Sequence, residues 1–297
     1  MPQYYTKFVC RADKCKHTCC AGWEIDIDER TLSRYNAVSG EFGERIKKSI
    51  TMGDGMPCFA LNYDKCPFLN DSGLCDIITV LGEEYLCQIC SDHPRFRNFQ
   101  KDRTEIGLGL ACEAVASLVL FSNEYDLVEI DDDGKTDSVD EWERYLLEKR
   151  EVLFNLAKSS NDFAEKIKYI LAEVGAKLPS LNVKRWRKIY LSLERLDEKW
   201  TTVLENLKPI SVVRNENIYT RVLVYMLFRH ILFAENESDL RARTAFAVHA
   251  TLFISAVADT LQSLGELNCD CESARLYSSE IEYSDDNLYS LIDLFVD

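Results

Sequence analysis

The distribution of cysteine along the chain is the feature that most constrains how it can fold. Ten of the twelve cysteines lie within residues 1–112, and the remaining two, Cys269 and Cys271, form an isolated C-x-C far downstream. Turn-forming triplets such as Gly53-Asp54-Gly55 and Asp71-Ser72-Gly73 occur in the same N-terminal part. Because loop-rich segments with many thiols are commonly held together by ligation, this pattern predicts a region organised by a metal more than by regular secondary structure.

The chemistry expected of these cysteines depends on where the protein resides. The first residues, MPQYYTKFVCRADK, contain no apolar segment typical of a secretory signal, so we expect a cytoplasmic protein with reduced thiols. The longest uncharged stretch, Thr244 to Ala258, is shorter than the roughly 20 residues that span a membrane. The net charge of −15 argues against nucleic acid as a partner and is compatible with a lysine-presenting one.

The second half of the chain has the periodicity of helices. An acidic stretch from Leu127 to Asp140 separates the two halves, and we interpret it as a solvated linker or loop. Beyond it, apolar residues recur at helical spacing, first from Trp142 and then from Phe163. Further helices are expected at about 183–206, 216–235, 238–265 and 276–295. In the first half, helices are expected only over 28–50 and 113–121.

These patterns predict a mainly α fold in two parts. Residues 1–125 are expected to form a cysteine-rich, loop-dominated metal-binding region. This region is expected to pack on an α-helical bundle formed by residues 141–297.

The cysteines of the first half fall into short motifs. They begin with C-x4-C-x3-C-C, continue through two separate cysteines and a C-x2-C pair, and end at the start of a probable helix; the residues are Cys10, Cys15, Cys19, Cys20, Cys66, Cys75, Cys87, Cys90 and Cys112. Thiolates are the ligands that soft iron and zinc prefer. The adjacent Cys19 and Cys20 indicate either two centres or one thiol outside the ligand shell. The spacings match no standard zinc finger, which favours an iron–sulfur cluster. Structural zinc, and disulfides or inert buried thiols, stay open as alternatives, and spacing alone does not separate iron from zinc.

Four other side chains are candidates for a pocket beside such a centre. Trp23 follows the cysteine pair, Arg95 follows His93-Pro94, and Tyr225 and Arg229 lie four residues apart on one face of an apolar helix. Each has a structural alternative. Trp23 can simply pack over the site, and Arg229 needs a partner that is either a structural carboxylate or an anionic ligand.

One histidine is expected to have no functional role. His249, in AFAVHATLF, is interpreted as a core histidine with satisfied hydrogen bonds.

Several common cofactor signatures are missing. The sequence has no G-x-G-x-x-G after a strand, no G-x4-G-K-[ST] phosphate loop and neither ferredoxin spacing. The C-x3-C-x2-C run of radical S-adenosylmethionine enzymes is also absent. The chain is therefore not a familiar dinucleotide-binding protein, nucleotide hydrolase or electron carrier.

The assembled motifs resemble the flagellin lysine N-methylase family of bacteria. The matching segments are FVCRADKCKHTCCAGWEIDID, CPFLNDSGLCDIITVLGEEYLCQICSDHPRF, GLGLACEAVASLVL and ENIYTRVLVYMLFRH. The resemblance covers the chain from Tyr4 to about Phe233. The first part is also similar to a wider family of zinc- or iron-chelating cysteine-cluster domains.

The resemblance implies methyl transfer from S-adenosylmethionine to lysines of flagellin, with a 4Fe–4S cluster bound by the cysteine motifs. The cysteines that it marks as ligands are Cys10, Cys15, Cys19, Cys20, Cys66, Cys75, Cys90 and Cys112. Cys58 and Cys87 stand outside the motif pattern. Trp23 and Tyr225 would line the pocket, and Arg229 or Arg95 would hold the cofactor carboxylate. No general base stands out, and a zinc- or iron-binding module without catalysis is the alternative function.

Overall fold

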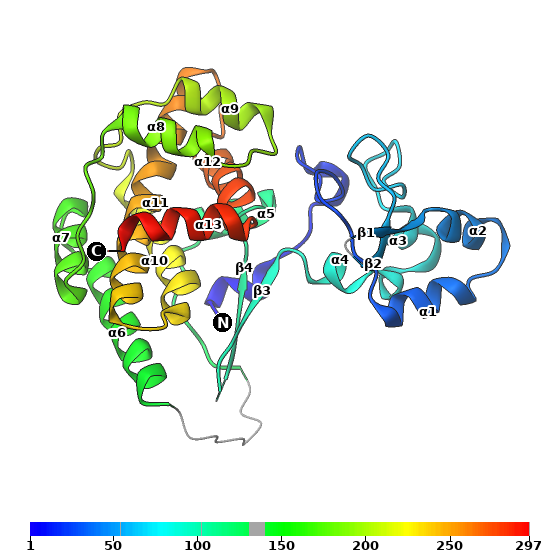
Figure 1. Cartoon of the computed structure of the whole chain (residues 1–297), viewed down its shortest axis with the longest axis horizontal. Coiled ribbons are helices and arrows are strands. Elements are labelled where there is room, and N and C mark those ends of the chain that lie inside the picture. The colour runs from blue at the N-terminus through cyan, green and yellow to red at the C-terminus, as the bar shows by residue number, and fades with distance from the viewer. Residues whose placement is uncertain (54, 102, 131–139, 297) are drawn as a thin grey trace. The chain divides into compact units, whose positions relative to one another are not determined.

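The computed structural model describes residues 1–53, 55–101, 103–130 and 140–296, and these divide into two compact units (Figure 1). The cysteine unit is Val9–Phe96, and the helical unit is Met1–Phe8 together with the chain from Arg97 onward. This division differs from the expected boundary near residues 125–141. The helix predicted at 113–121 belongs to the helical unit because it packs against the helices of residues 216–230 and 269–277. Of the predicted acidic linker, residues 131–139 lie outside the described residues.

The cysteine unit is built from short elements. They are a 3-10 turn at Ala12–Lys14, α1 (Glu29–Ala37), α2 (Gly40–Lys48), β1 (Ile50–Gly53), β2 (Met56–Phe59), α3 (Asp76–Leu81), a 3-10 turn at Glu83–Tyr85 and α4 (Gln88–Asp92). Strands β1 and β2 form an antiparallel hairpin in which Ile50 pairs with Phe59. The Asp28 carboxylate caps α1 by accepting a hydrogen bond from the Thr31 backbone N–H at 3.0 Å.

The single helix predicted over 28–50 is wrong, because the chain turns between α1 and α2. Gly40 has a φ of +81°, a left-handed conformation that glycine adopts without cost. The turn brings the Val38 carbonyl so close to Gly43 that a Cβ there would lie 2.2 Å from the carbonyl oxygen. The segment therefore forms two short helices joined by a tight turn instead of one continuous helix.

The cysteine unit also has a conventional apolar core. Its buried members are Ile25, Ile27, Tyr35, Ile46, Phe59, Cys66, Phe68, Ile77 and Cys87. Rings of Phe59 and Phe68 meet edge-to-face with centroids 5.0 Å apart. An apolar core thus organises this unit, a contribution that the sequence-based interpretation, with its emphasis on ligation, did not include.

The helical unit is formed by longer helices. Its elements are β3 (Arg95–Phe99, which begins at the end of the cysteine unit), β4 (Thr104–Leu108), α5 (Glu113–Phe121), α6 (Glu141–Lys158), α7 (Phe163–Val174), α8 (Val183–Ser192), α9 (Glu198–Glu205), α10 (Glu216–His230), α11 (Glu237–Ser263), α12 (Cys269–Tyr277), a π-helical turn at Ser278–Glu282 and α13 (Asp285–Ile292), with 3-10 turns at Gln3–Lys7, Ile231–Phe233 and Asp293–Phe295. Strands β3 and β4 pair in a two-stranded sheet. The mainly helical fold class is confirmed.

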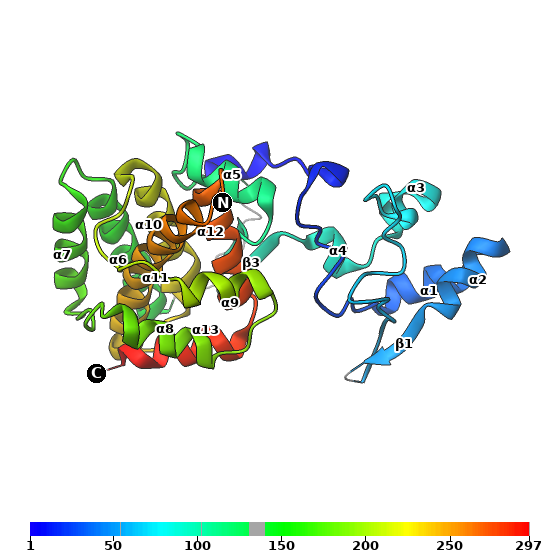
Figure 2. The same cartoon turned by 90° about the horizontal axis from the view of Figure 1, so that it is seen from above.

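Helix α11 is the centre of this unit and packs against α10, α12 and α7 (Figures 1 and 2). By length and composition α11 could cross a membrane, but 94% of its most apolar window is buried inside the structure. Core helices commonly have this composition because every face contacts a neighbour.

Two of the predicted helices in this half are interrupted. Residues 183–206 form α8 and α9, separated at 193–197, and residues 276–295 form the end of α12, the π-helical turn and α13. The Glu280 carboxylate accepts hydrogen bonds from the Leu196 and Asp197 backbone N–H groups at 3.0 and 2.8 Å. A distant carboxylate therefore satisfies the amides that a continuous α8–α9 helix would have used.

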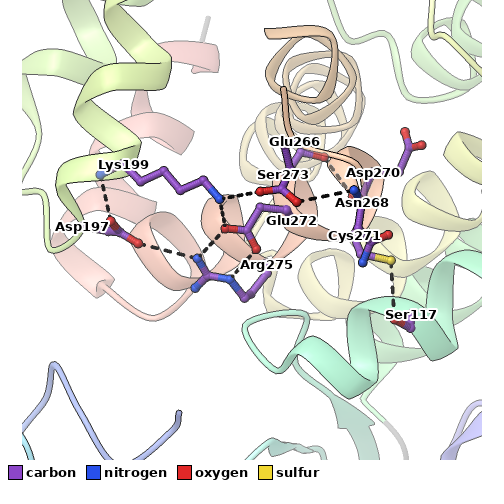
Figure 3. A network of polar contacts seen from close by, with 10 residues as sticks. All are labelled: Ser117, Asp197, Lys199, Glu266, Asn268, Asp270, Cys271, Glu272, Ser273 and Arg275. Atoms are coloured by element: carbon purple, nitrogen blue, oxygen red, sulfur yellow. Dashed lines mark hydrogen bonds and ion pairs between the residues drawn. The ribbon is translucent and has the colours of Figure 1, made fainter. Parts of the chain in front are cut away.

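An ion-pair network joins α9 to α12 (Figure 3). The Lys199 ammonium contacts Glu266 at 3.0 Å and Glu272 at 2.8 Å, and Arg275 Nε contacts the second oxygen of Glu272 at 2.9 Å. On the other side of α12, the Cys271 sulfur lies 3.5 Å from the Ser117 hydroxyl of α5. The isolated C-x-C motif is thus part of the helix packing.

Candidate functional site

Five thiols lie together in and around the apolar core of the cysteine unit. Two of them, Cys66 and Cys87, are buried core members, and Cys20, Cys75 and Cys90 pack against that core. The backbone brings them there: the Cys66 N–H donates to the Cys20 carbonyl at 2.8 Å, and Cys75 and Cys87 occupy the residue positions that directly precede α3 and α4. We call these five residues the thiol cluster.

The sulfur atoms of the thiol cluster lie within electrostatic reach of one another. Burial, together with the neighbouring Cys20, Cys75 and Cys87, raises the pKa of Cys66 to about 12. A hydrogen bond between Cys87 and Cys90 lowers the pKa of Cys87 and raises that of Cys90. Thiolates held this close repel one another, and a bound cation would relieve that repulsion.

A further contact orients one of the sulfurs. The hydroxyl of the buried Tyr35 lies 3.5 Å from the Cys87 sulfur and donates to the Tyr85 carbonyl at 2.8 Å. Burial and the nearby thiols raise the pKa of Tyr35, so the hydroxyl stays protonated. Outer groups of this kind tune the sulfur of a metal-binding cysteine.

The thiol cluster fits a soft metal in its chemistry, because it supplies up to five sulfur donors. Its geometry is not set for one ion: within the described ranges, no three His, Cys, Asp or Glu side chains are arranged to hold a metal. All twelve cysteines occur as thiols and none forms a disulfide. The metal therefore stays a proposal.

The predicted ligands are divided between the two units. Cys20, Cys66, Cys75 and Cys90 belong to the thiol cluster. Among the others, Cys10 and Cys19 are exposed, Cys15 is half-buried, and Cys112 lies in the helical unit as the N-cap residue of α5. The structure thus brings together half of the predicted set.

Cys87 is the member of the thiol cluster that was left out of the expected ligand set. It is 1% exposed and belongs to the buried core. The C-x2-C spacing with Cys90 was the available signal, since a short turn places two such sulfurs side by side. Cys58, also set aside, lies on β2. Burial is the largest cause of its raised pKa and Glu24 the next, whereas no thiol among the described residues contributes.

Trp23 and Arg95 have local partners in the cysteine unit. The Trp23 indole N–H donates to the Cys19 carbonyl at 2.9 Å, and its ring packs against the core that contains the thiol cluster. This is the packing role that the sequence left open. The Arg95 guanidinium donates to the Ser91 carbonyl at 3.3 Å. The ring of His93 lies 6.4 Å from that of Trp23, and burial lowers the His93 pKa to about 4.

Tyr225 and Arg229 meet at a buried carboxylate in the helical unit. Glu282, on the π-helical turn, contacts Arg229 Nε at 3.1 Å and accepts a hydrogen bond from the Tyr225 hydroxyl at 3.1 Å. His230 Nε2 lies 3.0 Å from the same carboxylate. Arg229 thus has the structural carboxylate partner that was one of its two expected environments. We call Tyr225, Arg229, His230 and Glu282 the Glu282 network.

The charges of the Glu282 network are balanced inside the protein. Burial disfavours the Glu282 carboxylate, but Arg229 and the hydrogen bond from His230 outweigh it and hold the pKa at about 2. Burial lowers the pKa of His230, which is therefore neutral near pH 7. The network contains one positive charge, on Arg229, and one negative charge, on Glu282. Their attraction is strong in the low-dielectric interior, and removing either residue would leave the other charge buried and uncompensated.

Two hollows lie in the helical unit. A cavity of about 10 Å³, enough for one water molecule, is lined by Tyr4, Arg221, Tyr225 and Phe228 among others. A groove of about 410 Å³ lies between α9 and the end of α11, and none of the predicted site residues lines it.

Taken together, fold and site define a mainly helical protein that carries a separate thiol-rich unit. Three relatives are similar to it, each 30% identical over 128 residues, or 40% of this chain. They are the lysine-N-methylases of Salmonella typhimurium and Salmonella choleraesuis and the flagellar biosynthetic protein FliU of Salmonella muenchen. The aligned part covers 31% of each lysine-N-methylase and 75% of FliU. The chain belongs to the lysine-N-methylase and FliU family, which confirms the resemblance seen in its motifs.

No protein-family model matches the chain. No solved structure matches it either.

Proposed function

We propose that this protein is an S-adenosylmethionine-dependent protein lysine N-methyltransferase that acts on flagellin. The observation that carries the proposal is the similarity to two proteins named lysine-N-methylase and to FliU. The net charge of −15 supports it, because an acidic surface attracts a lysine-bearing protein. The chain spans about a third of the length of the two lysine-N-methylases, so the activity of the whole relative is a proposal here.

Methylation requires a neutral amine aligned with the methyl group of the sulfonium donor. The lysine ammonium first loses a proton to water. The N–C bond then forms as the S–C bond breaks, the sulfonium leaves as a neutral thioether, and the positive charge passes to the methylated amine. Desolvation of the lysine or a nearby base must lower its pKa for this to occur near pH 7. No described side chain is assigned as that base.

The thiol cluster is the proposed holder of a 4Fe–4S cluster, with zinc as the alternative. The proposed ligands are Cys20, Cys66, Cys75 and Cys90, which are motif cysteines and also members of the thiol cluster, with Cys87 as a fifth candidate. When bound, an iron–sulfur cluster supplies an iron site that can hold the amino-acid end of S-adenosylmethionine. The protein's own part is to bury the sulfurs and to direct the Tyr35 hydroxyl at Cys87.

The test is a methylation assay on anaerobically purified protein. Flagellin and S-adenosylmethionine are added, and methyl-lysine is detected by mass spectrometry alongside metal analysis. We expect methyl-lysine and bound iron in the wild type, and loss of both in Cys66→Ser. The matched control is Cys58→Ser, which replaces a buried cysteine outside the thiol cluster and should keep both. Metal-loaded protein without methylation would instead support a metal-binding module without catalysis.

A further inference from the structure

The Glu282 network stands at a break in regular helix geometry. Helix α12 ends at Tyr277 and continues as a π-helical turn, Ser278–Glu282, before the chain leaves at Tyr283. A π turn accommodates an extra residue and changes which side chains face inward, and such turns are frequent at functional sites. Here the turn directs Glu282 into the protein, where its side chain is 0% exposed.

Glu282 holds three donors from α10 at once. In addition to the contacts with Tyr225, Arg229 Nε and His230, its backbone carbonyl accepts a hydrogen bond from Arg229 at 3.2 Å. Arg229 also donates to the Tyr225 hydroxyl at 3.0 Å. A buried ion pair of this kind is often no more stabilising than an apolar replacement. We therefore expect its effect in the positions of the groups that it contacts.

The network reaches the loop that precedes α5 from two sides. The Leu110 backbone N–H lies 3.4 Å from the Tyr225 hydroxyl and donates to it. Tyr283, whose ring stacks on the Arg229 guanidinium at 5.2 Å, places its hydroxyl against Gly109. A Cβ at Gly109 would lie 2.1 Å from the Tyr283 hydroxyl oxygen, so only glycine permits this contact.

This loop carries Cys112 into its position at the start of α5. The Cys112 N–H donates to the Gly109 carbonyl at 3.3 Å, which closes a turn over Gly109–Cys112. We propose that Glu282 is a positioning residue that fixes the Gly109–Cys112 loop through Tyr225 and Tyr283. The functional meaning of this loop rests on the proposed function and on Cys112 being a ligand, as the family resemblance implies, whereas the positioning itself does not.

The direct test is the alkylation rate of Cys112 in reduced, metal-free, full-length protein, followed by mass spectrometry of its peptide. Glu282→Gln keeps the shape of the side chain but leaves Arg229 without its counter-charge. We expect the rate at Cys112 to rise about tenfold, the effect of making local opening 1.4 kcal/mol easier. The matched control is Glu280→Gln on the same π turn, whose carboxylate instead serves the Leu196 and Asp197 amides and which should leave the Cys112 rate unchanged.

A second variant keeps the proposal testable if Glu282→Gln does not fold. Tyr225→Phe keeps the ring and removes only the hydroxyl between Glu282 and Leu110, and it too should raise the Cys112 rate. Urea denaturation of every variant separates global stability from this local effect. A wild-type Cys112 rate in both Tyr225→Phe and Glu282→Gln, or an equal rise in Glu280→Gln, would overturn the proposal.

A kinetic comparison adds a readout that a purely structural role would not move. If flagellin is methylated, Glu282→Gln should lower kcat about tenfold or more at unchanged KM, because small displacements of a site cost rate. A change in KM alone would contradict positioning. Because alkylation needs neither flagellin nor S-adenosylmethionine, failure of the proposed function would leave the positioning test intact.

Discussion

His249 has an unusual environment for a titratable residue. It lies in the middle of α11 at 0% exposure, with the Trp186 ring centroid 3.8 Å away and the rings of Tyr190, Phe253 and Phe295 around it. Its burial was predicted, but its expected hydrogen bonds were not found: among the described residues neither ring nitrogen has a partner. An unpaired buried polar group costs free energy, and protonating it there would cost more.

This environment predicts a pH-dependent loss of stability. Burial, with a smaller contribution from Arg185, lowers the His249 pKa from 6.5 to about 3. The unfolded state therefore takes up a proton below pH 6.5 while the folded state does not, and stability falls as the pH falls. Between pH 7.5 and 5.5 the loss from this residue should be about 1.4 kcal/mol.

The measurement is urea denaturation at both pH values for the wild type and His249→Leu. The variant should lose about 1.4 kcal/mol less than the wild type on acidification. Equal losses in the two proteins would show that His249 has a partner in solution.

At the scale of elements, a buried ion pair joins strand β4 to α6. Arg150 NH1 of α6 contacts Glu105 of β4 at 2.7 Å, and its second nitrogen contacts the other carboxylate oxygen. The Arg150 side chain is 4% exposed and its guanidinium lies 5.4 Å from the Phe228 ring centroid. Bidentate geometry and an aromatic neighbour make Arg150 poorly replaceable by lysine.

Breaking this pair from one side should be costly. Glu105→Gln leaves a buried guanidinium without its carboxylate, and we expect a loss of about 3–5 kcal/mol. Replacing both residues by apolar ones, Glu105→Leu with Arg150→Met, should recover most of that loss because no charge stays buried. Denaturant unfolding measures both.

The neighbouring Lys149 provides the control. It pairs with Glu173 at 2.6 Å, but both side chains are partly exposed, so Lys149→Gln should cost less than about 1 kcal/mol. A loss in Glu105→Gln no larger than in Lys149→Gln would mean that water reaches the Arg150 pair.

At the scale of the whole molecule, the two units differ in how they are stabilised. The helical unit has α11 at its centre and an extensive apolar core. The cysteine unit has short elements, a small core and the thiol cluster within it. A ligand that binds only the folded form stabilises what it binds, by about 2.7 kcal/mol at a hundredfold excess over Kd.

Metal removal should therefore act mainly on the cysteine unit. We expect a chelator to raise hydrogen exchange around the thiol cluster and to leave α10 and α11 unchanged. Hydrogen exchange at the start of α5 tests Cys112 separately. The chelator should raise exchange there as well if Cys112 is a ligand. Loss of protection in α11 of similar size would contradict independent stabilisation of the two units.

Prediction from sequence succeeded where a signal is local. The helices from Trp142 and Phe163 and the long helix over 238–265 follow from apolar periodicity, which one helix face imposes on its own segment. The break near Val38 had a local signal, since Gly40 has a φ of +81°, but apolar periodicity alone does not register it. The break at 193–197 depends instead on Glu280, more than 80 residues away, which satisfies two amides.

The same distinction applies to the site. Cysteine spacing identified four members of the thiol cluster, and helical spacing placed Tyr225 and Arg229 on one face. The cysteine spacing also included Cys87, which was nevertheless left out of the expected ligand set. Glu282 was not predicted, since its contacts depend on which segments fold against it.

By itself, the amino-acid sequence determined the family, the thiol-rich first part and the helical second part, because composition, spacing and periodicity are properties of neighbouring residues. Tertiary structure alone decided that the helix after the cysteines joins the helical unit, that Arg229 is neutralised by Glu282, and that the ring nitrogens of His249 have no hydrogen-bond partner among the described residues. These depend on the burial and distance of groups far apart in the chain, and burial and distance set the strength of every charge and hydrogen bond.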